Sequence, residues 1–358
     1  MIGQRVRLAR ESCGLTQSEL GDLAGLTQRA ISDIESGRKR EPPASAIERV
    51  AQVTGFPRSF FYRGPLPDLP DGFYRKLASV PSKLDKQIRA QARQIVEIIQ
   101  RADKRYKLPS VAVKPITRLG GSEGIEALAA SVRRVLGIGG LDRIGNVMRA
   151  VERAGVVVVR LPGRVHGHDS FSVWPDYGLK GRPLIVLTAG HSGDRDRFTV
   201  GHELGHLIMH SERRGIERKD AEAEASRFAG ALLLPRDAAI EEMSPPITLR
   251  VLMGVKASYG LSIAAGAKRA FDLNLISQPH YESLHKQLSA RKWKRQEPID
   301  VPQERPVLVS KIIAALGGDG PVPERAERVG MQVFAFQALV SMGQFPFQVS
   351  HSSGEKSA

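Results

Sequence analysis

Cysteine is nearly absent from this 358-residue chain, which has a single thiol at Cys13. One thiol can form no disulfide within the chain and cannot supply a thiolate metal cluster. Any metal site therefore has to be built from histidine and carboxylate side chains. A lone cysteine is also typical of a reducing compartment, so we expect a cytoplasmic protein.

Long apolar runs are also missing. No stretch approaches the roughly 20 apolar residues that a membrane-spanning helix requires. The N-terminal MIGQRVRLARESCG lacks the apolar segment of a secretory signal peptide. We therefore expect a soluble protein with no membrane partner.

Acidic residues are scarce relative to basic ones. The chain has 38 Asp and Glu against 53 Lys and Arg, which gives a formal net charge of +15. Such a surplus favours polyanionic partners such as nucleic acid. The hydrophobic fraction of 41% is ordinary for globular proteins, and the length allows two or three domains with a sizeable core.

The distribution of Gly, Pro and apolar residues predicts a mainly α protein with a small β-sheet, an α+β fold. Strands are predicted in VVVVRL, DSFSVW and RPLIVLT, and helices nearly everywhere else. The expected parts are an all-helical domain at 1–63, a linker and long basic helix at 64–110, a domain with the sheet at 111–240, a helical extension at 241–300, a small region at 301–349 and a disordered tail at 350–358. We expect the basic helix, at 83–106, to be a connector or a dimer helix and not a second nucleic-acid contact.

The first 63 residues follow a pattern of short capped helices. Thr16 and Glu19 form the Thr-x-x-Glu capping box of one helix, Gly25 ends it, and Thr27 can cap the next. The residues expected to point inward are Leu20, Leu23, Ala24, Ala30, Ile31 and Ile34.

The segment LTQSELGDLAGLTQRAISDIESGRKREPP resembles the Xre/Cro-type helix-turn-helix over the whole module. Such a module presents the start of its second helix to base edges in the major groove. The residues expected at DNA are Gln28, Arg29 and Ser32 for base edges, with Gln17, Arg38, Lys39 and Arg40 for phosphate. The resemblance implies a double-stranded DNA operator as partner and a homodimer on DNA. The alternative for these residues is an ordinary solvated surface.

The most specific chemical pattern is RFTVGHELGHLIMH at 197–210, which sets two histidines and a glutamate in an otherwise apolar run. On a helix, His202 and His206 project from one face, and Glu203 lies about 100° round the axis. Two imidazole ligands with an adjacent carboxylate base are what zinc-dependent hydrolysis requires. The alternative is a pair of core histidines with ordinary hydrogen-bond partners.

A catalytic zinc usually takes a third protein ligand, and the following helix offers Asp220, Glu222 and Glu224. Glu222 shares a face with Ser226 and Ala229, whereas Glu224 lies on a flank expected to be solvated. We therefore predict Glu222 as the third ligand, with Glu224 as the alternative. Ser226 is expected to hydrogen-bond a ligand.

Three further histidines lie near this pattern. His210 is expected at the end of the helix, solvated or hydrogen-bonded, and not as a ligand. His166 and His168 are expected to be loop residues, with a role as oxyanion stabilisers as the alternative.

The stretch FTVGHELGHLIMH, followed by EAEASRFAGALLLP, resembles the ImmA/IrrE family of zinc metallopeptidases, which is similar to the gluzincins. The three predicted strands resemble the small sheet of that family. The resemblance implies a Zn²⁺-dependent endopeptidase with Glu203 as its base and Glu222 as its third ligand. Where this chain has Ser226, many members have Asn. The implied substrate is a helix-turn-helix repressor, cut in a stress, phage or mobile-element response, by an activity that can stay latent until a signal arrives.

A regulator that cuts nothing is the alternative reading of the same chain. Its peptidase-like domain would sense a ligand, for example in short-chain acyl metabolism, or hold a structural zinc. Glu203 discriminates between the two hypotheses, because a purely structural site has no use for a base beside its ligands.

Overall fold

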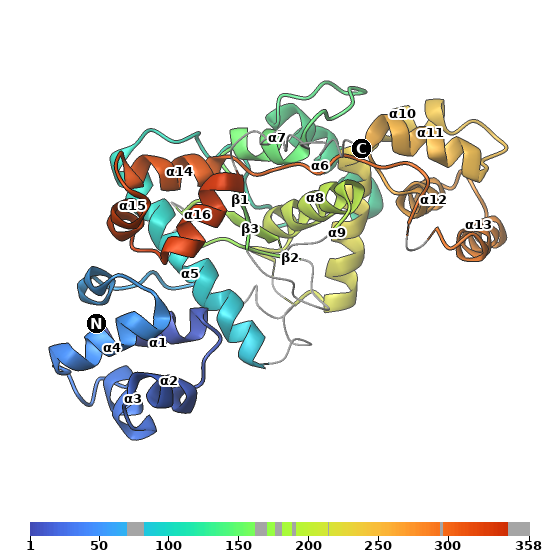
Figure 1. The fold of residues 1–358 in the computed structure, drawn as a ribbon. Helices are drawn as coiled ribbons and strands as arrows, with labels where there is room; N and C mark the ends of the chain where they lie inside the picture. Colours follow the sequence, from blue (N-terminus) through green and yellow to red (C-terminus); the bar gives the residue numbers. More distant parts are fainter. Residues whose placement is uncertain are drawn as a thin grey trace, which may run out of the picture.

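The computed structural model of the chain describes residues 1–69, 82–161, 170–175, 181–187, 191–213, 215–293 and 296–342. Helices dominate these residues, and a single small sheet lies among them (Figure 1). The predicted mainly α, α+β fold is thereby confirmed. Among the described residues, none of the helices combines the length and the hydropathy needed to cross a bilayer.

The N-terminal part is a small helical domain. It contains α1 (Ile2–Ser12), α2 (Gln17–Ala24), α3 (Gln28–Glu35), α4 (Ala44–Thr54) and the 3-10 helix η1 (Arg58–Tyr62). The predicted capping box is confirmed, since the Thr16 hydroxyl accepts from the Glu19 N–H and the Glu19 carboxylate accepts from the Thr16 N–H. Thr27 caps α3 as predicted. Gly25 takes a φ of 61°, the left-handed conformation that allows the tight turn between α2 and α3.

The buried faces of α2 and α3 correct one prediction from the sequence. Leu20 and Ala24 of α2 are buried, as are Ile31 and Ile34 of α3. Leu23, which was expected to point inward, is 63% exposed. Leu20 and Ala24 lie one turn apart and fill the narrow inner face of this short helix. Leu23 lies on the neighbouring face of the helix, which is exposed to solvent.

Helix α5 (Ser82–Arg105) connects the N-terminal domain with the sheet, and Figure 1 shows it running from one to the other. Ala90 belongs to the core of the N-terminal domain. Ile88, Ile95 and Ile99 belong instead to a core that the helix shares with the sheet and α14. One helix therefore contributes to two hydrophobic cores.

The sheet has the order β1-β3-β2, with β1 (Val157–Arg160) parallel to β3 (Leu184–Leu187) and β2 (Ser170–Val173) antiparallel to β3. Alternate residues point to opposite faces, as the strand period requires. Val158 and Ile185 face the core that includes α8, whereas Val157 and Val186 face the core of α5 and α14. Both faces of the sheet are thus covered by helices.

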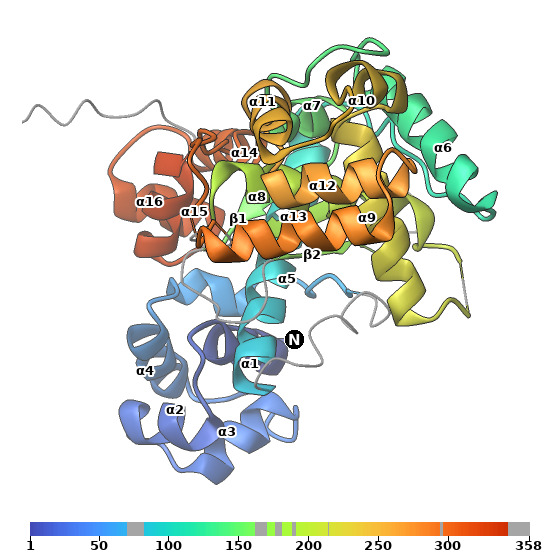
Figure 2. The same ribbon diagram turned by 90° about the vertical axis from the view of Figure 1, so that its right-hand side faces the viewer.

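The remaining helices surround the sheet and extend from it. They are α6 (Gly121–Val135), α7 (Val147–Arg153), α8 (Gly193–Met209), α9 (Arg218–Leu233), α10 (Arg236–Glu242), α11 (Leu249–Tyr259), α12 (Ile263–Asp272), α13 (Gln278–Ala290), α14 (Leu308–Gly317), α15 (Val322–Val329) and α16 (Val333–Met342). Figure 2 shows α10 to α13 gathered on one side of the molecule, with α14 to α16 beside them. The chain thus returns to the neighbourhood of α5 and the N-terminal domain at its last helices.

Candidate metal centre and nucleic-acid interface

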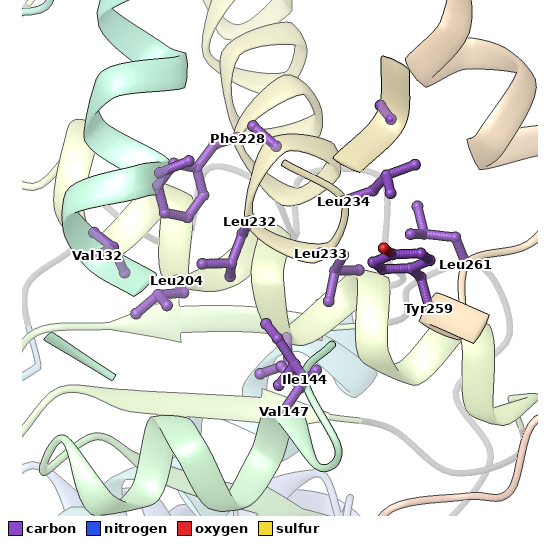
Figure 3. Close-up of a cluster of buried hydrophobic side chains, with 14 of the residues drawn as sticks. Val132, Ile144, Val147, Leu204, Phe228, Leu232, Leu233, Leu234, Tyr259 and Leu261 are labelled. Atoms are coloured by element: carbon purple, nitrogen blue, oxygen red, sulfur yellow. The ribbon is translucent and has the colours of Figure 1, made fainter. Parts of the chain in front are cut away.

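Helices α8 and α9 pack closely because glycine and alanine line their contact. Gly201 faces Ala229, and Gly205 faces Ala225 and Phe228. A Cβ atom added at Gly205 would lie only 3.0 Å from Cδ1 of Phe228. Figure 3 shows Phe228 in the buried cluster at this contact, together with Leu204 of α8. This close approach brings polar side chains of the two helices within reach of each other.

Three of these side chains converge on one point. The Nε2 atoms of His202 and His206 are 3.0 Å apart. Glu222 places Oε2 3.2 Å from the first of these atoms and Oε1 3.5 Å from the second. One ligand atom from each residue lies within 4.8 Å of the others, so the three can share one metal ion. The structure brings together the three residues that were predicted from the sequence as metal ligands. That they bind zinc stays a prediction.

The outer sides of the two imidazoles fit a metal site. Ser226 Oγ lies 3.3 Å from Nδ1 of His202, and Nδ1 of His210 lies 2.9 Å from Nδ1 of His206. A proton on each ligand Nδ1 satisfies both contacts and leaves both Nε2 lone pairs for a cation. Ser226 thus lies where a hydrogen bond to a ligand was expected. Two imidazoles and a carboxylate also form a donor set that Zn²⁺ prefers.

His210 and Glu224 form a polar chain behind His206. Nε2 of His210 lies 2.9 Å from Oε2 of Glu224, and Nη1 of Arg213 lies 2.6 Å from the same oxygen. Burial lowers the pKa of His210 to about 4, although the hydrogen bond to Glu224 opposes this shift. His210 is therefore neutral near pH 7 and can accept from His206. Glu224 is engaged with Arg213 and His210, so Glu222 is the carboxylate of the pair that faces the two ligand imidazoles.

Glu203 is almost fully buried, with 1% of its surface exposed. Its carboxylate accepts hydrogen bonds from Ser170 Oγ at 2.7 Å and from Ser172 Oγ at 2.8 Å. The alternation of β2 points both serines towards α8, while Phe171 and Val173 face the opposite core. The contact of these two serines with Glu203 was not predicted from the sequence. The alternation of Ser with large apolar residues in SFSV does indicate that both serines lie on one face of the strand.

His166 and His168 lie outside the described residues, so their expected loop role has no structural description here.

The residues expected to read bases lie at the start of α3. Gln28 and Arg29 are exposed there, whereas Ser32 is half-buried. Gln28 donates from Nε2 to Oε1 of Gln17 at 2.9 Å, and Gln17 donates from Nε2 to Glu35 at 2.9 Å. This chain of hydrogen bonds fixes the two glutamine side chains relative to each other.

The residues expected at phosphate lie in the loop after α3. Arg38 is exposed and forms an ion pair with Asp33 at 3.1 Å. Lys39 and Arg40 are also exposed. All three lie on the exposed surface beside the end of α3, where no part of the described core covers them.

Comparison with known proteins assigns the two regions to families. Residues 2–59 match the model of a helix-turn-helix domain, and residues 151–271 match that of the IrrE N-terminal-like domain of the peptidase M78 family. The second range contains α8, α9 and the three candidate ligands. The chain therefore joins a helix-turn-helix domain to an IrrE N-terminal-like domain.

Two similar proteins carry descriptions as transcriptional regulators. The chain is 36% identical over 61 residues to an uncharacterized HTH-type transcriptional regulator of Sinorhizobium medicae (strain WSM419). It has the same identity over the same length to an uncharacterized HTH-type transcriptional regulator of Rhizobium meliloti (strain 1021). Each match covers 17% of this chain and 43% of the relative, so less than half of either relative is spanned.

Proposed function

We propose that this chain is a DNA-binding transcriptional regulator whose second domain is a zinc-dependent endopeptidase. The observation that carries the proposal is the convergence of His202, His206 and Glu222, with Glu203, the residue that follows His202 on α8, buried on the same helix. Ligands alone would serve a structural zinc. A carboxylate next to them, held by two hydroxyl groups, is the arrangement that hydrolysis uses.

Each residue has a defined task in this proposal. His202, His206 and Glu222 would hold the ion, and Ser226 and His210 orient the two imidazoles through their Nδ1 atoms. When bound, zinc supplies a Lewis acid that polarises the scissile carbonyl and lowers the pKa of a water molecule. Glu203 accepts the proton of the attacking water and passes it to the leaving amine. The hydrogen bonds from Ser170 and Ser172 hold this carboxylate in place.

We propose a helix-turn-helix repressor as the protein substrate, cut in a stress, phage or mobile-element response. The association of the candidate peptidase with a helix-turn-helix domain supports this choice, because the DNA-binding domain would bring the peptidase to operators that such a repressor occupies. The exposed Gln28 and Arg29 support direct reading of double-stranded DNA by this chain.

The proposal is tested by zinc content and by cleavage of purified helix-turn-helix repressors from the same organism. His202→Ala and Glu222→Ala should lose zinc, because each removes a ligand, whereas Glu203→Gln should keep it. All three variants should lose cleavage. Asp220→Asn is the matched control, since Asp220 is exposed on the same helix as Glu222, and it should keep both properties.

Two results would contradict parts of this proposal. Cleavage that persists in Glu203→Gln removes the assigned base. Wild-type protein that binds zinc but cuts no repressor, with or without operator DNA, supports the structural or ligand-sensing alternative instead.

A further inference from the structure

A hollow of about 800 Å³ lies between the helix-turn-helix domain and the start of α5. Gln17, Gln28 and Ser32, three of the residues expected at DNA, line it from α2 and α3. Lys83 and Lys86 line it from the first turns of α5. The two lysines therefore share one concave surface with the candidate base-reading residues, although they lie more than 50 positions further along the sequence.

The hollow carries a surplus of positive charge. Its basic lining residues are Arg7, Arg10, Lys83 and Lys86, and its carboxylates are Glu11 and Glu35. Both carboxylates are already paired, Glu11 with Arg7 at 2.9 Å and Glu35 with Arg10 at 2.6 Å. Lys86 is exposed and has no ion pair among the described residues. An anionic partner is the chemistry that this surface fits.

Lys83 forms an ion pair with a residue of the helix-turn-helix domain. Its Nζ lies 2.9 Å and 3.0 Å from the carboxylate oxygens of Glu19, the capping-box residue of α2. The Lys83 side chain is nevertheless 54% exposed. An exposed pair of this kind is weak, so an incoming phosphate can compete with it.

Further contacts fix the first half of α5 relative to α1. Gln87 and Gln91 each donate from Nε2 to the carbonyl oxygen of Ser12 at 3.2 Å. Farther along α5, Glu97 accepts from the buried Arg5 of α1 at 2.7 Å. The two lysines are therefore held on a rigid element and not on a free linker.

We propose that Lys83 and Lys86 contact the DNA backbone beside the bases that α3 reads. The DNA-binding surface then extends beyond residues 2–59 to the first turns of α5. This inference rests on the proposed DNA binding, and it changes the expectation that the basic helix is only a connector or a dimer helix. Duplex DNA is the favoured anion because the lysines share the hollow with the candidate base-reading side chains.

The experiment measures binding of the full-length protein to a mixed-sequence duplex of about 30 base pairs, roughly three helical turns, over a series of salt concentrations. The double variant Lys83→Gln/Lys86→Gln should bind on the order of tenfold more weakly. The slope of log affinity against log salt should become shallower by about 1.8, the value for two lost phosphate contacts. The loss should be the same for every sequence tested, because phosphate contacts carry no sequence information.

The matched control is Lys104→Gln/Lys107→Gln. These two exposed lysines have the same spacing in the sequence; Lys104 lies in the last turn of α5, roughly 30 Å from Lys83 at 1.5 Å per residue, and Lys107 follows the helix. The control should bind like the wild type. Lys83→Arg/Lys86→Arg, which keeps both charges, should also bind like the wild type.

The outcomes separate this inference from the proposed function. Wild-type protein that binds no duplex removes both this inference and the proposed DNA binding, and leaves the proposed peptidase to its own test. Wild-type binding with an unchanged or tighter Lys83→Gln/Lys86→Gln variant overturns the inference alone. Gln28→Ala should alter the preferred DNA sequence and leave the salt slope unchanged. If Gln28→Ala has this effect and the lysine double variant has none, the helix-turn-helix domain reads DNA and α5 has no role in binding.

Discussion

Glu152 is a buried carboxylate that ties α7 to the start of α14. Its oxygens accept from the backbone N–H groups of Val307 and Leu308 at 2.8 to 3.2 Å. Burial raises the pKa of Glu152 to about 6, and these hydrogen bonds oppose the shift only in part. The folded protein therefore holds this proton more tightly than the unfolded chain does.

This shift predicts a pH-dependent contribution to stability. The pKa rises from 4.5 in the unfolded chain to about 6 in the folded protein, so the contribution is fully present below pH 4.5. It is lost as the pH rises through about 6, and amounts to about 2 kcal/mol. The free energy of unfolding of the wild type, measured by denaturant titration relative to Glu152→Gln, should fall by this amount between pH 4.5 and 7. Parallel pH profiles of the two proteins would contradict the assignment.

At the residue scale, the sequence predicted the side chains whose chemistry depends on local spacing. His202, His206 and Glu222 follow from helical periodicity within two segments. The hydroxyls of Ser170 and Ser172 on Glu203 did not follow, because no local rule says which strand lies opposite α8. His210 was expected to be solvated or hydrogen-bonded, and the second of these states is present.

At the element scale, the spacing between α8 and α9 decides whether the candidate ligands can meet. Gly205 leaves little room for a side chain, because an added Cβ would lie 3.0 Å from Cδ1 of Phe228 and 3.4 Å from Cα of Ala225. Phe228 is itself fully buried in the core cluster, so any shift of its ring disturbs packed neighbours. By contrast, Gly254 of α11 (Leu249–Tyr259) is exposed, and a Cβ added there would meet nothing within 4 Å.

These two glycines predict opposite effects of the same substitution. Gly205→Ala should lower the free energy of unfolding by about 1–3 kcal/mol through overpacking, and it should weaken zinc binding by moving α9 outward. Gly254→Ala should raise the free energy of unfolding by about 0.5–1 kcal/mol, because alanine favours a helix interior. Denaturant titration of both variants, with zinc affinity measured on each, checks the pair. A stabilised Gly205→Ala protein would show that the helix contact is looser than described.

Element boundaries were predictable where a cap or a turn residue sets them. Thr16, Glu19 and Thr27 act within one helical turn, so their role can be recognised without tertiary information. The burial of Leu23 was predicted wrongly because the width of the inner face of α2 depends on neighbouring helices. Similarly, the spacing of apolar residues in α5 predicted one apolar face, but not that residues of this face pack into two separate hydrophobic cores.

At the scale of the whole molecule, buried polar contacts join the helix-turn-helix domain to the rest. Arg5 of α1 forms an ion pair with Glu97 of α5 at 2.7 Å, and its side chain is 1% exposed. Arg63 donates to the carbonyl oxygen of Val329 at 2.7 Å, and Gln94 donates to that of Gly330 at 3.0 Å. The N-terminal domain is thus held both by α5 and by the C-terminal helices.

The Arg5–Glu97 pair predicts that the stability of α1 to α4 depends on their contact with α5. Glu97→Ala leaves a buried guanidinium without its carboxylate, which should cost about 3–5 kcal/mol. Backbone amides of α1 to α4 should then exchange with solvent faster than those of the sheet, as hydrogen-exchange mass spectrometry would show. The control is Glu48→Ala, which removes an exposed pair with Arg58 and should cost at most about 1 kcal/mol. Equal effects of the two variants would argue against coupling through this pair.

The return of the last helices to the first domain has a consequence for processing of the chain. Ser59 and Arg63 contact Glu327, and Gln332 donates a hydrogen bond to the carbonyl oxygen of Thr54. Non-covalent contacts therefore join the N-terminal domain to the C-terminal helices. A backbone nick in the intervening hundreds of residues would leave the fragments together in native solution. The two fragments of a nicked molecule would separate only after denaturation, and the helix-turn-helix domain would stay bound to the C-terminal fragment until these contacts break.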